Sequence, residues 1–315
     1  MNGIIVIDKP AGWTSHDVVA KLRGALKEKR IGHGGTLDPM ATGVLPIFVG
    51  RATRAVEFCI GSDKEYIAGL QLGITTDTQD ITGNILKTVE TSVTAEELAE
   101  KLPQFLGPQK QTPPMHSAIK IDGKKLYDLA RRGIEVPRPE RDIHIFEIEI
   151  LDERLETQGR FSCFKPETGG LSQRFVCFTL RVTCSKGTYI RTLCHDIGAA
   201  LGCGGVMSSL RRTRAGAFSI EMAHPLDEAL AASWDARTVP PSHLLMPVDS
   251  LFREYPPIKL GEPETRKCKN GAPTTIENTE DGTYRFYGPD NEFLLLGKIE
   301  SGILKIIKGF YSKDL

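Results

Sequence analysis

Strand-like and helix-like segments follow one another along this chain without a regular order, and that order restricts the fold. An apolar stretch at residues 4–7 is followed by a helical spacing of apolar residues over 18–26, and then by strand-like stretches at 44–49 and 64–72. A doubly wound parallel sheet needs strands and helices in strict alternation. We therefore predict an α+β fold with a mixed, largely antiparallel central sheet and flanking helices.

The middle of the chain adds two long strand-like stretches that suit an antiparallel pair. Residues 143–150 alternate between apolar and polar, but the phase slips near residues 145–146, which predicts a β-bulge. Residues 176–184 alternate regularly. The segment between them, residues 156–173, is rich in glycine, serine, threonine and charge, and we interpret it as an exposed loop or extended hairpin turn. Further helices are predicted over residues 94–105, 124–132, 190–201 and 225–232.

The length and a proline-rich segment indicate how the chain is divided. The 315 residues suffice for one large and one small domain. Residues 233–248 have the proline content of a linker, and after them come a short helical pattern and three strand-like stretches. We predict a large domain over residues 1–235, a linker over 236–250 and a small β-rich domain over 251–315.

Charge alone does not identify a partner. The formal net charge is zero, which counts mildly against nucleic acid, because phosphate binding normally needs a basic surface. Basic residues do cluster within residues 110–141 and again at 211–214. Such clusters are compatible with an RNA groove, but most charge runs are solvated faces.

Other features limit the compartment and exclude some kinds of site. The chain has no apolar stretch long enough to span a membrane, and its first residues lack the pattern of a signal peptide. The seven cysteines include no C-x-x-C pair, which argues against both a disulfide framework and a zinc site. We expect a cytoplasmic protein with reduced thiols, no metal site and no membrane association.

A single carboxylate, Asp38, lies in a run of glycine, proline and small residues that spans residues 32–46. Loops with this much glycine usually hold a special backbone conformation, which favours a functional role. The alternative is an acidic residue that begins a tight turn before Pro39. The rest of the sequence has to decide between the two readings.

Four motifs occur in order along the chain. They are G-T-L-D-P at 35–39, K-E-Y at 64–66, K-G-T-Y-I-R at 186–191, and L-G-C-G-G with S-L-R-R-T at 201–205 and 209–213. Over about residues 3–218 the chain resembles the TruB family, enzymes that make pseudouridine in the T arm of tRNA. The resemblance implies isomerisation of uridine 55 in the T stem-loop by a monomeric, cofactor-independent enzyme whose partner is tRNA.

The resemblance also implies roles for individual residues. Asp38 would be the catalytic carboxylate, and both attack on ribose C1′ and removal of the 2′ proton remain open. Tyr66 would stack on the uracil, and Arg191 would pair with Asp38 and keep it ionised, because a buried carboxylate without a partner tends to become protonated. The residues expected to bind the substrate nucleotide are His33, Lys64, Tyr189 and Leu210.

Residues of about 110–141 resemble the family's thumb insertion, which clamps the T stem-loop. The residues expected to contact RNA are Lys120, Lys124, Lys125, Arg131, Arg132 and Arg211. The small domain over 251–315 matches an appended PUA-like RNA-binding domain by position, size and strand content. Two positions depart from the family pattern: His116 stands where tyrosine is usual, and Gly34 where threonine is common.

Two other kinds of protein share some of these features. A non-catalytic RNA-binding or tRNA-folding protein could keep the same groove, but binding alone does not need Asp38, Tyr66 and Arg191 together. A hydrolase with an aspartate nucleophile would usually need a second carboxylate at a defined separation. The motifs place no second acidic residue for that purpose.

Overall fold

The computed structural model describes residues 1–117, 119–121, 123–130, 132–156, 175–234 and 243–312. The chain forms two compact units, the first made of Met1–Gly61 and Arg214–Leu315 and the second of Ser62–Thr213. Arg131, nearly all of the segment predicted as a loop over 156–173, and part of the predicted linker lie outside the described residues. No helix in the described ranges combines the length and the apolar character needed to cross a bilayer.

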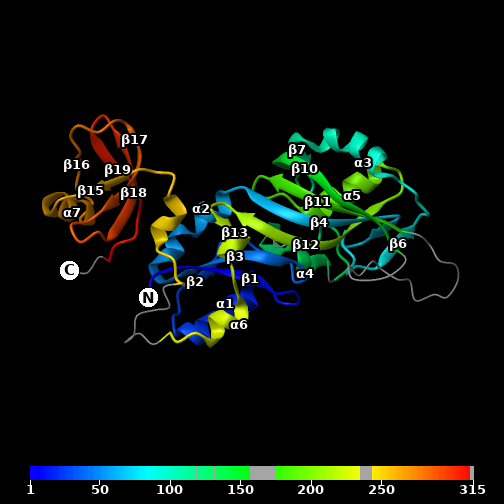
Figure 1. The fold of residues 1–315 in the computed structure, drawn as a ribbon, viewed down its shortest axis with the longest axis horizontal. Helices are drawn as coiled ribbons and strands as arrows, with labels where there is room; N and C mark the ends of the chain where they lie inside the picture. Colours follow the sequence, from blue (N-terminus) through cyan, green and yellow to red (C-terminus); the bar gives the residue numbers. More distant parts are fainter. Residues whose placement is uncertain (118, 122, 131, 157–174, 235–242, 313–315) are drawn as a thin grey trace. The chain divides into compact units, whose positions relative to one another are not determined.

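The first unit begins with a small sheet and two helices on one of its faces. The elements are β1 (Gly3–Lys9), α1 (Ser15–Leu26), β2 (Ile31–His33), β3 (Thr42–Val49), β14 (His224–Pro225) and α6 (Leu226–Ala231). Strand β3 pairs antiparallel with both β1 and β2, and β14 pairs parallel with β1. Figure 1 shows α1 and α6 side by side, where Val18 and Leu22 of α1 and Leu226 of α6 share a buried core with Ile5 and Leu45 of the strands.

Thr14 caps the start of helix α1. The side chain of Thr14 accepts a hydrogen bond from the backbone of Asp17, whose carboxylate accepts one from the backbone of Thr14. This reciprocal capping box satisfies backbone N–H groups that a helix start leaves without partners.

The opposite face of β1 packs against the chain that follows β3 and against the C-terminal part of the unit. Here lie η1 (Gly50–Ala55), α2 (Val56–Gly61), β13 (Phe218–Ser219), η3 (Ile220–Met222) and η4 (Val248–Phe252). Ile4 and Val6 alternate with the residues that face α1, and they join Phe48, Cys59 and Phe252 in a second buried core. Both faces of β1 are therefore covered within this unit.

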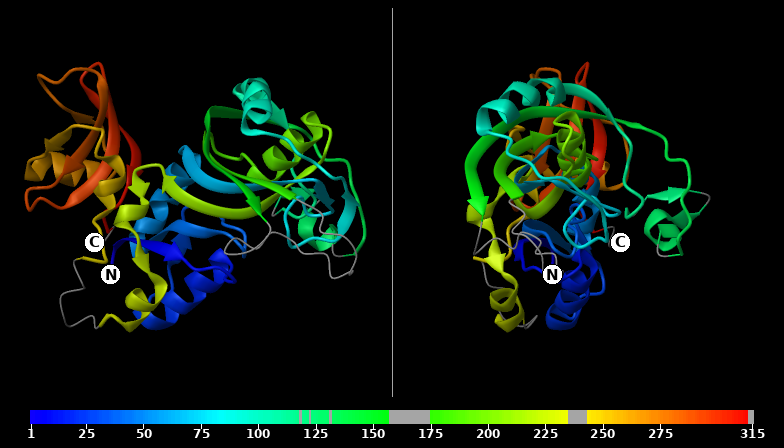
Figure 2. Two further views of the ribbon diagram at one scale, coloured as in Figure 1. Left: turned by 45° about the vertical axis from the view of Figure 1, so that its right-hand side comes forward. Right: turned by 90° about the vertical axis from the view of Figure 1, so that its right-hand side faces the viewer.

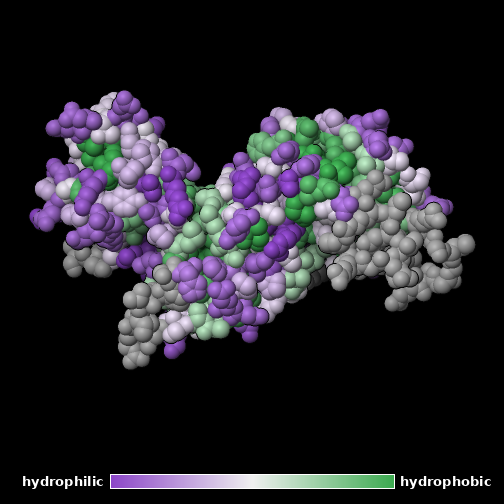
Figure 3. Space-filling model, in the orientation of Figure 1, coloured by the Kyte–Doolittle hydropathy of each residue, from purple (hydrophilic) through white to green (hydrophobic). Residues whose placement is uncertain are grey.

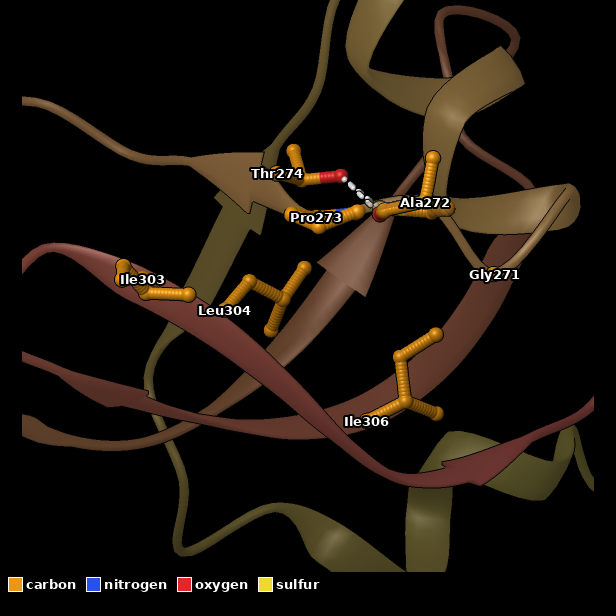
Figure 4. A pocket seen from close by; sticks show the side chains of 8 residues that line it. Gly271, Ala272, Pro273, Thr274, Ile303, Leu304 and Ile306 are labelled. Atoms are coloured by element: carbon orange, nitrogen blue, oxygen red, sulfur yellow. Dashed lines mark hydrogen bonds between the residues drawn. The ribbon is translucent and has the colours of Figure 1, made fainter.

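The C-terminal residues form a five-stranded sheet in the order β15-β17-β18-β19-β16 with its own core. Its elements are β15 (Pro257–Lys259), α7 (Glu262–Lys269), β16 (Thr274–Thr275), β17 (Gly282–Tyr287), β18 (Phe293–Glu300) and β19 (Ile303–Gly309). The predicted helix and three strands are present, and the short β15 and β16 were missed because so few residues show no periodicity. An apolar pocket of about 300 Å³ lies between β19 and the turn after α7, lined among others by Pro273, Leu304 and Ile306 (Figure 4).

The second unit contains strands in the order β12-β4-β11-β10-β7. Within this row β4, β11, β10 and β7 pair antiparallel, and β4, β11 and β10 run side by side in Figures 1 and 2. The larger elements are β4 (Lys64–Leu72), α3 (Ala95–Lys101), η2 (Leu102–Phe105), β7 (Gly107–Gln111), β10 (Arg141–Glu156), β11 (Phe175–Cys184), α5 (Ile190–Ala200) and β12 (Gly205–Ala215). The register of β10 against β11 shifts between Ile145 and Glu147, which confirms the predicted bulge. The fold is the predicted α+β class.

Smaller features complete this unit. A hairpin of β5 (Ile74–Thr76) and β6 (Ile85–Thr88) follows β4. Exposed apolar side chains occur at Leu106, Phe146 and Leu151, and Figure 3 shows apolar surface in the region of β7 and β10.

The helix predicted over residues 124–132 is wrong in its first turn. Strands β8 (Lys120–Ile121) and β9 (Lys124–Lys125) pair antiparallel, and α4 covers only Leu126–Ala130. The sequence Asp122-Gly123 explains the difference, because Asp-Gly between short strands is a strong signal for a tight hairpin. Gly123 has a φ of +78°, a conformation that favours glycine.

Candidate active site

Asp38 lies half-buried in the loop between β2 and β3. The buried Lys9 forms a hydrogen bond with the backbone of this loop. The Nζ atom of Lys9 donates hydrogen bonds to the carbonyl oxygens of Pro10 at 2.8 Å, Trp13 at 2.7 Å and Pro39 at 3.3 Å. An ammonium group removed from water needs such acceptors, because a buried charge is otherwise very costly. Lys9 therefore ties the residue after Asp38 to the turn after β1.

The residue before Asp38 is held as firmly. The hydroxyl of Ser15 accepts a hydrogen bond from the backbone N–H of Leu37 at 2.9 Å and lies 3.2 Å from the Leu37 carbonyl oxygen, to which it donates. The carbonyl oxygen of Pro39 also accepts from the backbone of Gly12 at 2.8 Å. The backbone on both sides of Asp38 is thus fixed by contacts with Lys9, Gly12 and Ser15.

The start of the same loop carries His33 and the two glycines. His33 ends β2 and is half-buried, and its ring makes an edge-to-face contact with that of His16 at a centroid distance of 5.3 Å. The backbone N–H of Gly34 donates to the Pro46 carbonyl at 2.8 Å. Gly35 has a φ of +129°, a backbone conformation that residues other than glycine rarely adopt.

In the second unit, the predicted residues of β4 are buried at one end of the strand. Tyr66 is 9% exposed and lies opposite Val182 of β11. Lys64 is also buried, and its Nζ donates to the carbonyl oxygen of Ser62. Both residues therefore lie on a strand of the sheet, and Lys64 is also held by Ser62, which precedes the strand.

Arg191 occupies the first turn of α5 and is buried, with acceptors on three residues. Its Nη1 donates to Oδ2 of Asp80 and to the Thr78 carbonyl, each at 3.3 Å, and its Nη2 donates to the His116 carbonyl at 2.8 Å. The departure at position 116 does not affect this contact directly, because a backbone oxygen accepts the bond. A planar guanidinium fork suits this use of several donors.

Asp80 is a site residue that the motif analysis missed. It is 4% exposed, and its Oδ1 accepts from the Thr82 N–H at 2.9 Å, the Thr82 hydroxyl at 2.5 Å and the Thr78 hydroxyl at 2.9 Å. The available signal was the polar, turn-like run of residues 75–83, where an aspartate between threonines favours side-chain bonds to nearby backbone. The predicted pairing of Arg191 with Asp38 joins the two units and stays a prediction.

The backbone of Tyr189 is positioned by a second residue that the sequence analysis missed. The side-chain amide of Gln111 in β7 accepts from the Tyr189 N–H at 2.8 Å and donates to the Tyr189 carbonyl at 3.0 Å. Gln111 is 5% exposed, so this two-bond clamp is shielded from water. It fixes the backbone two residues before Arg191.

The remaining predicted site residues differ in how exposed they are. Leu210 is 9% exposed on β12, and the neighbouring Arg211 is half-buried. Lys124 and Arg132 are exposed, as contact with RNA requires. The side chains of Lys120 and Lys125, and all of Arg131, lie outside what the structure describes. Within the described ranges no group of three or more His, Cys, Asp or Glu residues could hold a metal ion.

Two family models match the chain. The model described as "TruB family pseudouridylate synthase (N terminal domain)" matches residues 23–190, and the model described as "tRNA pseudouridylate synthase B C-terminal domain" matches residues 191–253. The two ranges together cover well over half of the 315 residues. The chain belongs to the TruB family. Membership makes it a pseudouridine synthase and confirms the resemblance found in the motifs.

Curated TruB relatives match along the full length. A protein of Clostridium kluyveri named tRNA pseudouridine synthase B is 39% identical and covers 98% of this chain and 100% of its own length. The protein of that name in Clostridium acetobutylicum is 40% identical and covers 98% of this chain and 99% of its own. The one from Alkaliphilus oremlandii is 50% identical over 73% of this chain and 71% of its own.

Solved structures agree with the TruB assignment of the fold. A chain of a Cbf5–Nop10–Gar1 complex is 26% identical with a TM-score of 0.69, and the match covers 99% of this chain and 85% of that one. A chain of an H/ACA ribonucleoprotein bound to a substrate RNA has a TM-score of 0.68 at 24% identity over 99% of this chain and 86% of its own, which speaks for the fold alone.

Proposed function

We propose that this enzyme converts uridine 55 in the T stem-loop of tRNA to pseudouridine, with Asp38 as the catalytic residue. The observation that carries the proposal is the anchoring of the Asp38 loop by Lys9 and Ser15 on either side of the carboxylate. A reacting group has to be held close to its productive position, since small misplacements are costly in rate. Full-length relatives named tRNA pseudouridine synthase B support tRNA as the substrate.

The reaction explains why a single carboxylate is enough. The bond from ribose C1′ to uracil N1 breaks, the uracil turns, and a bond from C1′ to C5 forms. C5 then loses its proton and N1 carries one, so the product is an isomer of the substrate and no cofactor is consumed. Asp38 serves this reaction either by attacking C1′ or by removing the 2′ proton, and the proposal includes both routes.

Two buried residues of the second unit complete the proposed catalytic group. Tyr66 provides a flat surface for the freed uracil and is a candidate for the last proton transfer. Arg191 pairs with Asp38 and keeps it ionised, because a nearby cation favours the charged form of a carboxylate. The contacts of Arg191 with Asp80 and His116 support this role by holding the guanidinium in one orientation.

The base is reached only after the nucleotide has been flipped out of the folded T loop, at a cost of roughly a few kcal/mol. His33, Lys64, Tyr189 and Leu210 receive the flipped nucleotide in this proposal. The basic residues of the thumb-like segment 110–141, together with Arg211, bind phosphates of the T stem-loop, and residues 251–315 act as a PUA-like RNA-binding domain. Such contacts position the RNA, and the shape of the loop supplies the selectivity.

The test is to incubate the purified protein with unmodified tRNA and to map pseudouridine at single-nucleotide resolution. We expect modification at position 55 and none in a tRNA in which cytidine replaces that uridine. Modification at another position would contradict the proposed target. Binding of tRNA without any pseudouridine would contradict the activity and favour an RNA-folding protein.

A further inference from the structure

Gly34 of the Asp38 loop packs closely against the side chains of Cys59 and Phe48. A Cβ atom added at position 34 would lie 2.4 Å from the Sγ atom of Cys59 and 3.0 Å from Cε2 of Phe48. Cys59 is fully buried, and its thiol lies 3.4 Å from the Gly34 carbonyl oxygen, to which it donates a hydrogen bond. The thiol therefore occupies the volume that a side chain at position 34 would need.

We propose that Cys59 is a positioning residue for the reaction, because its side chain sets where the Asp38 loop leaves β2. This inference rests on the proposed role of Asp38. The thiol does not touch the substrate and takes no part in bond making. It acts through Gly34, by contact and by the bond from Sγ to the carbonyl.

Helix α2 carries Cys59 and has further contacts that restrict its movement away from Gly34. The ring of Phe58 meets that of Phe252 edge-to-face at 5.2 Å, and Glu57 forms an ion pair with Lys308 at 2.6 Å. In the preceding turn, Nη1 of Arg54 donates to the Gly309 carbonyl at 3.0 Å. These contacts anchor α2 to the C-terminal part of the same unit, so extra volume at position 34 must displace the loop instead.

A displaced Gly34 would disturb Asp38, because only Gly35 and Thr36 lie between Gly34 and the hydrogen-bonded Leu37. Gly34 is tied to Pro46 of β3 through its N–H, and Leu37 is tied to Ser15 through both of its backbone groups. A shift at position 34 therefore strains the bonds that hold Leu37, the residue next to Asp38. Since a misplacement of about 1 Å can cost on the order of 100-fold in rate, a shift of about 0.5 Å is expected to cost about tenfold.

The test is a cycle of Gly34→Ala, Cys59→Ala and the double variant, measured as single-turnover pseudouridine formation on bound tRNA. We expect Gly34→Ala to slow the step at least about tenfold, with an unchanged dissociation constant for tRNA. Cys59→Ala alone should slow it only slightly. The double variant should recover part of the lost rate, because the 2.4 Å contact with Sγ is gone and only the contacts with Phe48 at 3.0 Å and with Cβ of residue 59 at 3.1 Å remain.

Two further variants distinguish positioning from general damage. Cys59→Ser keeps a donor of similar size and should stay close to the parent. Gly61→Ala adds the same methyl group in the same helix, where nothing lies within 4 Å, and should leave the rate unchanged. A double variant as slow as Gly34→Ala would overturn the proposal, and so would full activity in Gly34→Ala.

The free energy of unfolding, measured for the parent, Gly34→Ala, Cys59→Ala and the double variant, tests this inference independently of the proposed function. Contact between positions 34 and 59 predicts a favourable coupling energy in the double variant, whatever the enzyme modifies. If the parent makes no pseudouridine but the coupling is present, the proposed function fails and the packing relationship stands. If the parent is active and neither rate nor stability is coupled, this inference alone fails.

Discussion

The Oδ2 atom of Asp80 lies 3.3 Å from Nη1 of Arg191, and each side chain is only 6% exposed. Both partners are further bonded, Asp80 by Thr78 and Thr82, and Arg191 by the carbonyls of Thr78 and His116. A buried ion pair repays its desolvation only with such additional hydrogen bonds. The arrangement fixes the direction of the guanidinium, which is what pairing with a catalytic carboxylate would require.

Asp80→Asn should therefore slow pseudouridine formation while leaving tRNA affinity within about threefold. The amide keeps the shape but loses a charge-assisted bond worth roughly 1.5–3 kcal/mol, which corresponds to about 10- to 100-fold in rate if it is expressed in the transition state. Single-turnover kinetics would measure this. Glu149→Gln is the matched control, because its pair with Arg181 in the same unit is 41–48% exposed and such pairs contribute little. Equal effects of the two substitutions would contradict the role of Asp80.

Asp38→Asn should abolish product formation and leave tRNA binding within a few fold, because asparagine keeps the shape of the side chain and Lys9 and Ser15 still hold the loop backbone. Arg191→Lys should also be nearly inactive, since lysine cannot reproduce the fork that contacts Asp80 and His116 together. The measurements are product formation and tRNA binding for each purified variant. Measurable turnover by Asp38→Asn would remove that residue from catalysis.

Lys9→Met should destabilise the first unit by about 3 kcal/mol and reduce activity. Methionine keeps the apolar stem but leaves the carbonyls of Pro10, Trp13 and Pro39 without this donor in a buried place. Denaturant unfolding would give the stability. Lys29→Met, at an exposed position, serves as the control. A Lys9 variant as stable as that control would show that the ammonium does not anchor the loop.

Stability should fall above about pH 9 because of two buried thiols. Burial raises the pKa of Cys184 from 9.0 to about 11 and that of Cys194 from 9.0 to about 12. Below pH 9 both folded and unfolded chains hold these protons, so the thiols contribute no pH dependence. Above it only the unfolded chain releases them, and the unfolding free energy drops by up to about 1.4 kcal/mol per pH unit for each thiol.

Urea unfolding at pH 7, 9 and 10.5 would check this, with Cys194→Ala as the comparison. The variant should lose part of the slope above pH 9. An identical slope in the two proteins would mean that Cys194 already ionises in the folded state.

Reversing the charges of Lys124, Lys125, Arg131 and Arg132 together should weaken tRNA binding and flatten its salt dependence. Each phosphate contact that is lost should reduce the log–log salt slope by roughly 0.7 to 0.9. The chemical step on bound RNA should change much less. Binding from low to physiological salt, for variant and parent, would give the slopes, and equal slopes would assign these residues to a solvated surface.

Local patterns in the sequence were sufficient for most of the secondary structure. The capping residue Thr14, the alternation along β4 and the slipped phase near Ile145 all depend on neighbours within a few residues. Local patterns failed at the short strands β15 and β16, which show no periodicity, and in the first turn of the helix predicted over residues 124–132. At that turn helical periodicity and the Asp122-Gly123 hairpin signal point to different structures, and both signals are local.

The family, the α+β class and the motif residues can be read from the amino-acid sequence, because ordered motifs and periodicity are properties of neighbouring residues. The contacts that hold the motif residues in place become visible only in the folded chain. Lys9 meets Pro39 across 30 residues, and Arg191 meets Asp80 across 111. Such contacts depend on how strands and loops pack, and sequence periodicity does not predict them. In the sequence, a buried lysine, aspartate or cysteine cannot be told from an exposed one. The wall that Cys59 forms beside Gly34 is of the same kind, because it exists only once α2 has packed against the loop.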